Sequence, residues 1–234
     1  MTDLTIVHLY PRELGINGDI GNVTALRRRA EWRGMPVRVI DVGAGEDLPG
    51  TAHLVHIGSG PASSRAPLHD DVARHAATLR AWAADGVPFL AIAAGWQLLG
   101  REVIELDRTA RAGAKVFPSA AIVSAERAVG EVAGESELGE IAGFVNYGAT
   151  TILDRGVASL ARIAGTEDGL VAGNLVGTNL HGPFLPMNPV WADRLLSAAA
   201  RLAGVGPVDD DPRIAVLDDR ARRSRQAIRS RIGG

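Results

Sequence analysis

The sequence predicts an α/β fold: a doubly wound, mostly parallel sheet flanked by helices, with a smaller antiparallel β layer and C-terminal helices. Short apolar runs alternate with longer amphipathic ones through the first hundred residues, which favours parallel strands connected by helices over a β-sandwich. Shorter β-type runs separated by Gly, Ser and Asn follow from about residue 115 to 174. Helical periodicity then returns near the C-terminus.

The strands expected in the parallel sheet are short and apolar, and they lie at residues 4–9, 37–41, 54–57 and 89–92. A helix is expected at residues 22–33, where Val23, Leu26 and Ala30 recur at helical spacing and Gly34 supplies a stop. A second helix is expected at residues 70–85, with Gly86 as its stop. Its expected buried face is made by Val72, Ala76, Leu79 and Ala83.

The later elements follow from the same reasoning. β-type runs at residues 120–123, 128–132 and 141–145 predict a smaller antiparallel or mixed layer at the sheet edge. Pro189 has the fixed φ of a first helical turn and begins a helix expected over residues 189–202. We expect one domain at residues 1–206, followed at 207–234 by a linker and a basic C-terminal helix or tail.

Composition excludes several classes of function. The chain of 234 residues has a formal net charge of −2, so it has no overall basic field and no nucleic-acid partner is expected. No apolar run approaches the roughly 20 residues that span a bilayer, and a cytoplasmic location is expected. The sequence has no cysteine, which excludes disulfides and thiolate nucleophiles. No metal or other cofactor is expected, because the histidines do not form a recognisable ligand set; those considered are His53, His56, His69 and His75.

Residues 89–100 read Phe-Leu-Ala-Ile-Ala-Ala-Gly-Trp-Gln-Leu-Leu-Gly, an apolar strand that runs into a small-residue turn and a helix start. This pattern is typical of a nucleophile elbow, in which a sharp turn lifts one side chain above the strand ends. The helix N-terminus there offers N–H groups to an anion. The pattern also fits an ordinary strand-to-helix turn, because small residues are common at such turns.

His181 lies after an apolar β-like run and inside a Gly/Pro turn, within residues 174–189. An imidazole placed there can project toward the strand ends and act as a base. A single histidine at a strand end is more often a hydrogen-bonded structural group. The catalytic interpretation therefore needs a nucleophile beside it.

These stretches together resemble the CobB/CobQ-like class I glutamine amidotransferases. The elbow is similar to the Cys-Gly-Gly-Tyr-Gln-Leu-Leu-Gly motif of the cobyric-acid-synthase-like members. Residues 9–22, 30–34 and 178–183 look like the signatures of the GatD-type glutaminase subunits of lipid II isoglutaminyl synthases. The likeness runs from about residue 4 to 231 in the family's order, and it implies the flavodoxin-like layers of the class I enzymes.

The resemblance also implies a function and a partner. A GatD-type subunit supplies ammonia from glutamine to a Mur-ligase-like partner resembling MurT. That partner carries ATP and the acyl-phosphate, and it amidates the D-glutamate of lipid II, a peptidoglycan precursor. Glutamine or another small amine is the ligand expected for the subunit itself.

Carried over position by position, the family's nucleophilic cysteine falls on Ala93 and its general-base histidine on His181. The arginine associated with holding glutamine falls on Arg127. The residues expected to bind the substrate are Arg127, Gly58, Gly60, Ala94 and Gln97. The usual third triad member would fall on Pro183, but the closer subfamily lacks it too.

The departures from the family pattern matter more. A methyl group at Ala93 can neither attack an amide carbonyl nor hold a thioester, and the adjacent Ala94 and Gly95 offer no replacement. The resemblance places the loop that supplies an oxyanion donor at residues 58–62, where Pro61 has no N–H to donate. Four further positions also depart from the family's polar or aromatic residues: Ala62, Val145, Tyr147 and Asn179.

Because several segments of the site differ together, natural loss of the glutaminase is favoured over a laboratory Cys-to-Ala substitution. A second hypothesis is a pocket adapted to bind another amino acid or amine through Arg127 and His181. A third is an inactivated variant of an active glutaminase. His181 and Arg127 can also persist as structural groups.

Three acidic or amide residues and the C-terminal segment leave alternatives open. Asp19 and Asn22 fit helix capping as well as a site role, and Asp193 could orient the imidazole or simply be solvated. The last segment, residues 213–231, has seven arginines against two aspartates. An apolar stripe of Ile214, Leu217 and Ala221 predicts either a helix that docks on an acidic partner surface or a frayed basic tail.

Overall fold

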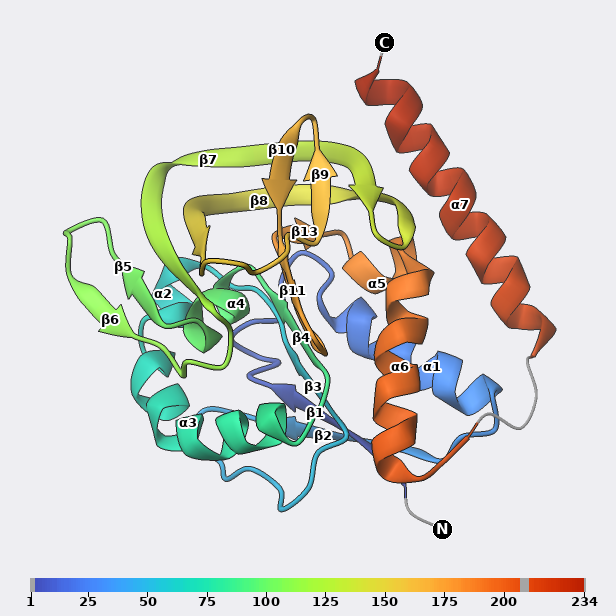
Figure 1. Ribbon diagram of the computed structural model, residues 1–234, viewed down its shortest axis with the longest axis horizontal. Coiled ribbons are helices and arrows are strands. Elements are labelled where there is room, and N and C mark those ends of the chain that lie inside the picture. The colour runs from blue at the N-terminus through green and yellow to red at the C-terminus, as the bar shows by residue number, and fades with distance from the viewer. Residues whose placement is uncertain (1–2, 207–210, 234) are drawn as a thin grey trace.

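The computed structural model describes residues 3–206 and 211–233, and its centre is a six-stranded sheet in the order β11-β12-β4-β3-β1-β2 (Figure 1). All neighbouring pairs are parallel except the edge pair of β11 and β12. The predicted α/β class and all four predicted parallel strands are confirmed. The strands are β1 (Leu4–Leu9), β2 (Val37–Val42), β3 (Leu54–Ile57), β4 (Phe89–Ile92), β11 (Leu170–Ala172) and β12 (Leu175–Thr178).

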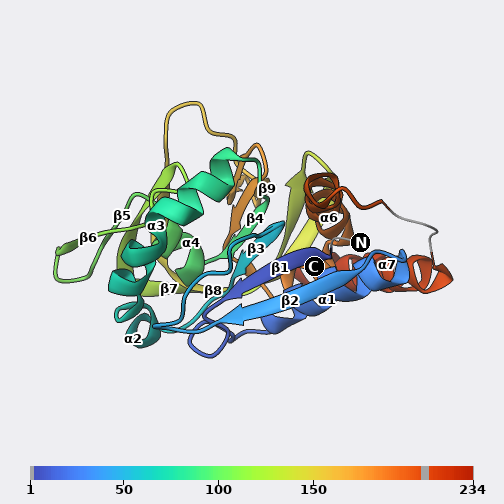
Figure 2. The same cartoon turned by 90° about the horizontal axis from the view of Figure 1, so that it is seen from below.

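Helices cover both faces of this sheet, as Figure 2 shows. The helices α1 (Ile20–Trp32) and α6 (Pro189–Ala203) pack on one face, and α3 (Leu68–Ala84) packs on the other. Successive strand residues point to opposite faces. Leu4 and Ile6 therefore belong to the hydrophobic core under α1 and α6, whereas Val7 and Leu9 belong to the core under α3. The inner strands β1, β3 and β4 are buried along their whole length, as expected for a sheet covered on both faces, whereas the edge strand β2 is mostly only partly buried.

The helix ends follow the sequence closely. The predicted stops are confirmed at Gly34 and Gly86, whose φ values are 68° and 86°. Pro189 occupies the first turn of α6 as expected. Asp19 is different, because its side chain makes no capping hydrogen bond to α1. Capping is therefore not its role.

A second, mostly antiparallel sheet of seven strands lies across the carboxyl ends of the first. The runs expected at residues 120–123 and 128–132 are one strand, β7 (Ser119–Ser136), with a register shift between Val123 and Ala128. It pairs along nearly its whole length with β8 (Gly139–Leu153). The other members are β5 (Glu102–Ile104), β6 (Ala110–Ala112), β9 (Ala161–Ile163), β10 (Thr166–Asp168) and β13 (Leu180–His181).

Three short helices connect the sheets and one long helix ends the described chain. The short ones are α2 (Ala62–Arg65), α4 (Ala94–Leu99) and α5 (Phe184–Met187). The basic segment forms α7 (Pro212–Ile232), which contacts α1, α5, β7 and β8. Within residues 3–206 and 211–233, no helix is long and apolar enough to cross a membrane.

The structure corrects two expectations about the C-terminal segment. The residues of α7 buried against the body are Ile214, Ala221 and Ile228, one every seven positions, whereas Leu217 is 37% exposed. The next residue, Asp218, forms an ion pair with Arg29 of α1 at 2.7 Å. Residues 211–233 are thus an ordered helix rather than a frayed tail. The linker expected just before it falls partly on residues 207–210, which lie outside the described residues.

Candidate functional site

Ala93 stands at a sharp turn between β4 and α4. Its φ of 41° and ψ of −103° lie in a region that residues with a side chain rarely adopt. Its N–H donates to the carbonyl of Thr178 at 2.9 Å, and its carbonyl accepts from the N–H of Gln97 at 2.9 Å. The turn has the strained backbone of a nucleophile elbow, although the residue on it carries only a methyl group.

The parallel register of the sheet determines what surrounds Ala93. Because β3 and β12 are the two neighbours of β4, the segments that follow them lie on either side of the elbow. Those segments are residues 58–62 and residues 179–183. A crevice at the carboxyl ends of parallel strands is where α/β sheets bind ligands.

His181 is completely buried in β13, where it pairs with Phe144 of β8. Neither ring nitrogen has a hydrogen-bond partner among the described residues. Burial, and to a lesser extent the positive charge of Arg127, lower the pKa of His181 to about 4. The imidazole is therefore neutral near pH 7, as a general base must be, but its proton affinity is low.

The Asp19 carboxyl faces this imidazole, and its Oδ2 lies 3.9 Å from Nδ1 of His181. The Asp19 carboxyl is fully buried, and its Oδ2 accepts from the N–H of Ser59 at 2.6 Å. Burial raises the pKa of Asp19 to about 8. The sequence left its role open between capping and the site, and the structure places it in the site.

Two other polar residues lie away from the imidazole. The side-chain amide of Asn22 donates to Oδ1 of Asp19 at 3.4 Å, and its Oδ1 accepts from the N–H of Leu185 at 2.8 Å. The second bond connects α1 to the segment after His181. Asp193 binds Arg29 and Arg33 on the far side of α1. It does not orient His181, because α6 directs it toward these arginines.

A cavity of about 420 Å³ opens beside Ala93. Five of the residues assigned from the sequence line it, and these are Ala93, Ala94, Gln97, Gly60 and Arg127. Arg127 reaches it from the irregular part of β7, where its Nη2 donates to the carbonyl oxygen and Oδ1 of Asn146 at 3.0 and 2.7 Å. Tyr147 also lines it, at a position that departs from the family pattern.

Gly58 and Gly60 have a structural role that the sequence did not show. A Cβ at Gly58 would lie 2.1 Å from the carbonyl oxygen of Leu14, and one at Gly60 would lie 2.4 Å from that of Glu13. Gly58 does not line the cavity, but its carbonyl accepts from the N–H of Gly95 at 3.0 Å. Both glycines let the segment before α1 pack against the loop, which brings Asp19 to His181.

No nucleophile is paired with the base in the described part of the chain. Ser59 and Ser124 line the cavity, yet neither hydroxyl is hydrogen-bonded to His181, whose nitrogens have no partner there. Covalent acyl transfer requires a nucleophile within hydrogen-bond reach of its base. Pro61, the N-cap residue of α2, contributes no N–H to this wall of the cavity.

No group of three or more His, Cys, Asp or Glu side chains suited to a metal ion is found among the residues that the structure describes. The histidines considered above have other neighbours. Nδ1 of His53 accepts from the N–H of Thr5, and His8 stacks on His56 with ring centroids 5.3 Å apart.

Comparison with known sequences identifies relatives of the whole chain. Residues 5–189 match the CobB/CobQ-like glutamine amidotransferase domain. The subunit GatD of the glutamine-hydrolysing lipid II isoglutaminyl synthase of Staphylococcus aureus is 32% identical, over 97% of this chain and all of that protein. The corresponding GatD subunit of Streptococcus pneumoniae is 25% identical, over 85% of this chain and 81% of that protein.

Solved structures of glutamine amidotransferases share the fold. One from Methylobacillus flagellatus has a TM-score of 0.57 at 13% identity and covers 89% of this chain and 98% of its own. Another, from Thermotoga maritima, has a TM-score of 0.55 at 15% identity and covers 97% of this chain and 93% of its own. At these identities the likeness establishes the architecture alone.

Proposed function

Because the chain belongs to the CobB/CobQ-like glutamine amidotransferase family, we propose that it is a GatD-like subunit of a lipid II amidating enzyme that does not itself hydrolyse glutamine. The observation that supports the absence of glutamine hydrolysis is Ala93 at the elbow. The family's chemistry begins with attack by a thiolate, and the sequence has none. The remaining scaffold then supports a partner.

The proposed partner is a Mur-ligase-like protein. The relatives in S. aureus and S. pneumoniae are named as subunits of lipid II isoglutaminyl synthase, so their activity belongs to an assembly. By analogy, the partner here would activate the D-glutamate carboxyl with ATP, and an amine would displace the phosphate. This chain would supply a binding surface, and the amine would come from solution or another source.

Glutamine hydrolysis in the purified chain and in the complex tests the loss of activity. We expect no release of glutamate above background, and no change on His181→Ala. In the complex, ammonium should support amidation of lipid II and glutamine should not. Glutamate release that His181→Ala abolishes would show that the chain has another nucleophile.

The substitution Ala93→Cys separates natural loss from a laboratory substitution. We expect the variant to remain inactive with glutamine, because Pro61 lacks a donor N–H and because Val145, Tyr147 and Asn179 also differ from the family pattern. If one substitution restored glutaminase activity, the chain would be an inactivated form of an active enzyme. A cysteine-containing GatD subunit serves as the positive control.

A second candidate function rests on the persistence of the cavity of about 420 Å³ with Arg127 in its wall. An arginine there suits the carboxylate of an amino acid. Calorimetric titration of the isolated chain with glutamine, glycine and other small amines distinguishes the two candidates. Stoichiometric binding without the partner, lost in Arg127→Ala, would favour the second.

A further inference from the structure

A second cavity, of about 500 Å³, lies on the other side of Tyr147 from the one that contains Ala93. It is enclosed by β8, the β9–β10 hairpin and α4. The elbow helix separates the two cavities, since Gln97 lines the first and Trp96 lines the second. No local pattern in the sequence indicates this second cavity.

Two carboxylates line this cavity: that of Asp168, the last residue of β10, and that of the more exposed Glu167. Oδ2 of Asp168 accepts from the hydroxyl of Thr178 and its Oδ1 from the side-chain amide of Asn179, each at 3.3 Å. Two neutral side-chain donors thus hold the carboxylate in position.

None of these donors neutralises the charge. No arginine, lysine or histidine forms an ion pair with Asp168 among the described residues, whereas the exposed neighbour Glu167 has Arg162 within 3.7 Å. Burial raises the pKa of Asp168, although the hydrogen bonds oppose the rise. Asp168 is partly buried, a carboxylate withdrawn from water without a counter-charge is costly, and such groups in cavities are often binding sites.

The remaining walls suit a cation with an organic body. Trp96, only 2% exposed, and Tyr147 bring two aromatic residues to the cavity, and aromatic faces attract ammonium groups. Leu153 and Val157 add apolar surface, and the hydroxyls of Thr150 and Thr151 add acceptors. Asn179, which departs from the tyrosine of the family pattern, leaves room beside Asp168.

We propose that this second cavity binds a small organic ammonium ion, whose charged nitrogen pairs with Asp168 between Trp96 and Tyr147. The site differs in chemistry from the first cavity, where Arg127 suits an anion. It depends neither on a nucleophile at Ala93 nor on the partner. A chain that cannot release ammonia would in this way hold an amine noncovalently next to its elbow.

Calorimetric titration of the full chain with n-propylammonium chloride tests the proposal, and n-propanol is the neutral probe of similar shape. We expect the ammonium to bind and the alcohol not to. Asp168→Asn keeps the shape of the side chain and removes the charge, so it should weaken binding at least about tenfold. Asp47→Asn is the matched control, because Asp47 is an exposed aspartate paired with Arg74, and it should change the affinity less than about twofold.

A second variant keeps the test decisive if Asp168→Asn unfolds the chain. Asn179→Tyr fills the cavity and leaves the Asp168 charge in place, so it should also weaken binding of n-propylammonium. Equal binding of n-propylammonium and n-propanol would overturn the proposal, as would undiminished affinity in Asn179→Tyr or in folded Asp168→Asn. The absence of any binding by the unmodified chain would overturn it as well.

Discussion

Ala93 keeps the backbone of a nucleophile although its side chain cannot react. A non-glycine residue at φ 41° and ψ −103° stores of order 1–3 kcal/mol of strain, which the surrounding structure must hold in place. Here the hydrogen bond from Ala93 N–H to Thr178 and the tight approach of Gly95 to Gly58 hold it. The strained backbone of an elbow is therefore present at Ala93 although its side chain is only a methyl group.

The buried Asp19 carboxyl predicts how the stability of the folded protein depends on pH. The folded pKa of about 8 lies above the ordinary value of 3.8 because of burial. Between these values the folded protein keeps a proton that the unfolded chain has lost, so its free energy of unfolding falls as pH rises. Asn cannot ionise, so the stability of Asp19→Asn relative to the parent should increase by about 3 kcal/mol between about pH 5.5 and pH 8.

Urea denaturation of both proteins at the two pH values measures this difference. Asp47→Asn provides the control, since Asp47 is 93% exposed in its ion pair with Arg74 and should follow the parent at both pH values. A difference between parent and Asp19→Asn that does not change with pH would mean that Asp19 is ionised in the folded protein at neutral pH.

At the scale of elements, one arginine joins three helices. Arg29 of α1 is 4% exposed and binds Asp193 of α6 through Nε and Nη2 at 2.8 and 2.6 Å. Its Nη1 binds Asp218 of α7 at 2.7 Å. Burial alone would lower the pKa of Arg29, but the two carboxylates raise it overall. The planar guanidinium can bind both carboxylates at once.

Removal of this arginine should loosen the three helices. Arg29→Met leaves Asp193 and Asp218 facing each other, and we expect the free energy of unfolding to fall by about 3 kcal/mol. Arg29→Lys should recover only part of that loss, because an ammonium is a point charge. Chemical denaturation measures both. The control Arg28→Met removes an exposed pair with Glu31 and should cost less than about 1 kcal/mol; a loss in Arg29→Met as small as this would contradict the prediction.

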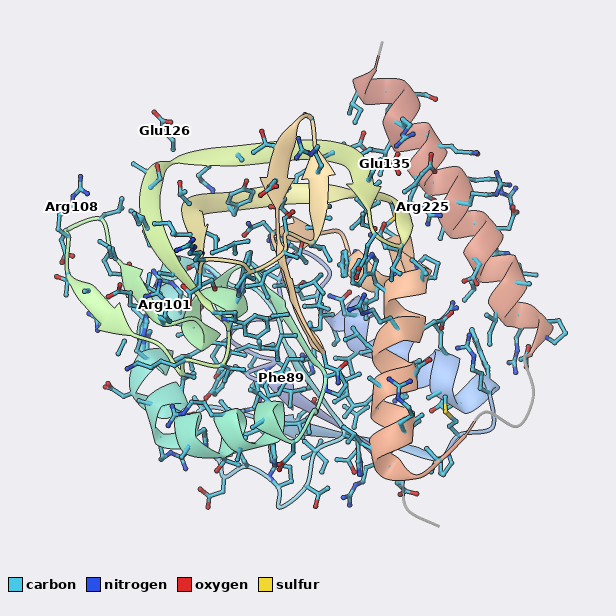
Figure 3. The ribbon with its side chains drawn as sticks, viewed as in Figure 1. Phe89, Arg101, Arg108, Glu126, Glu135 and Arg225 are labelled. Carbon is cyan, nitrogen blue, oxygen red and sulfur yellow. The ribbon has the colours of Figure 1, made fainter. Side chains whose placement is uncertain are left out.

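At the scale of the whole molecule, α7 connects the second sheet to the helices α1 and α5, because it contacts all of them. Its arginines pair with acidic residues of the long hairpin: Arg229 with Glu135 and Glu140, and Arg231 with Glu131. Figure 3 shows Glu135 beside α7 and Glu126 at the bend of β7, away from that helix. The acidic surface that the basic segment was expected to need is thus partly provided by its own chain.

Deletion of residues 211–234 tests whether α7 belongs to the fold. It would expose the surfaces that cover Ile214, Ala221 and Ile228, together with an apolar cavity of about 460 Å³ between α1, α5 and α7. We expect the thermal midpoint to fall by at least about 5 °C and binding of a hydrophobic dye to increase. Arg223→Ala, which removes only an exposed charge, should change neither. A truncated chain as stable as the parent would leave contact with the partner as the better explanation of the basic segment.

The sequence by itself determined the α/β class, the parallel strands and the ends of their helices, because these depend on local periodicity and on residues such as Gly34 and Pro189. It also determined that no thiolate can act at Ala93. The tertiary structure alone decided that Asp19 faces His181 rather than capping a helix, because residues 162 positions apart meet only when β1, β3 and β12 lie in one sheet. It alone decided that α7 packs on its own hairpin, because the pairing of Arg229 with Glu135 spans 94 residues. The second cavity around Asp168 arises in the same way, from segments of α4, β8 and β10 that no local pattern connects.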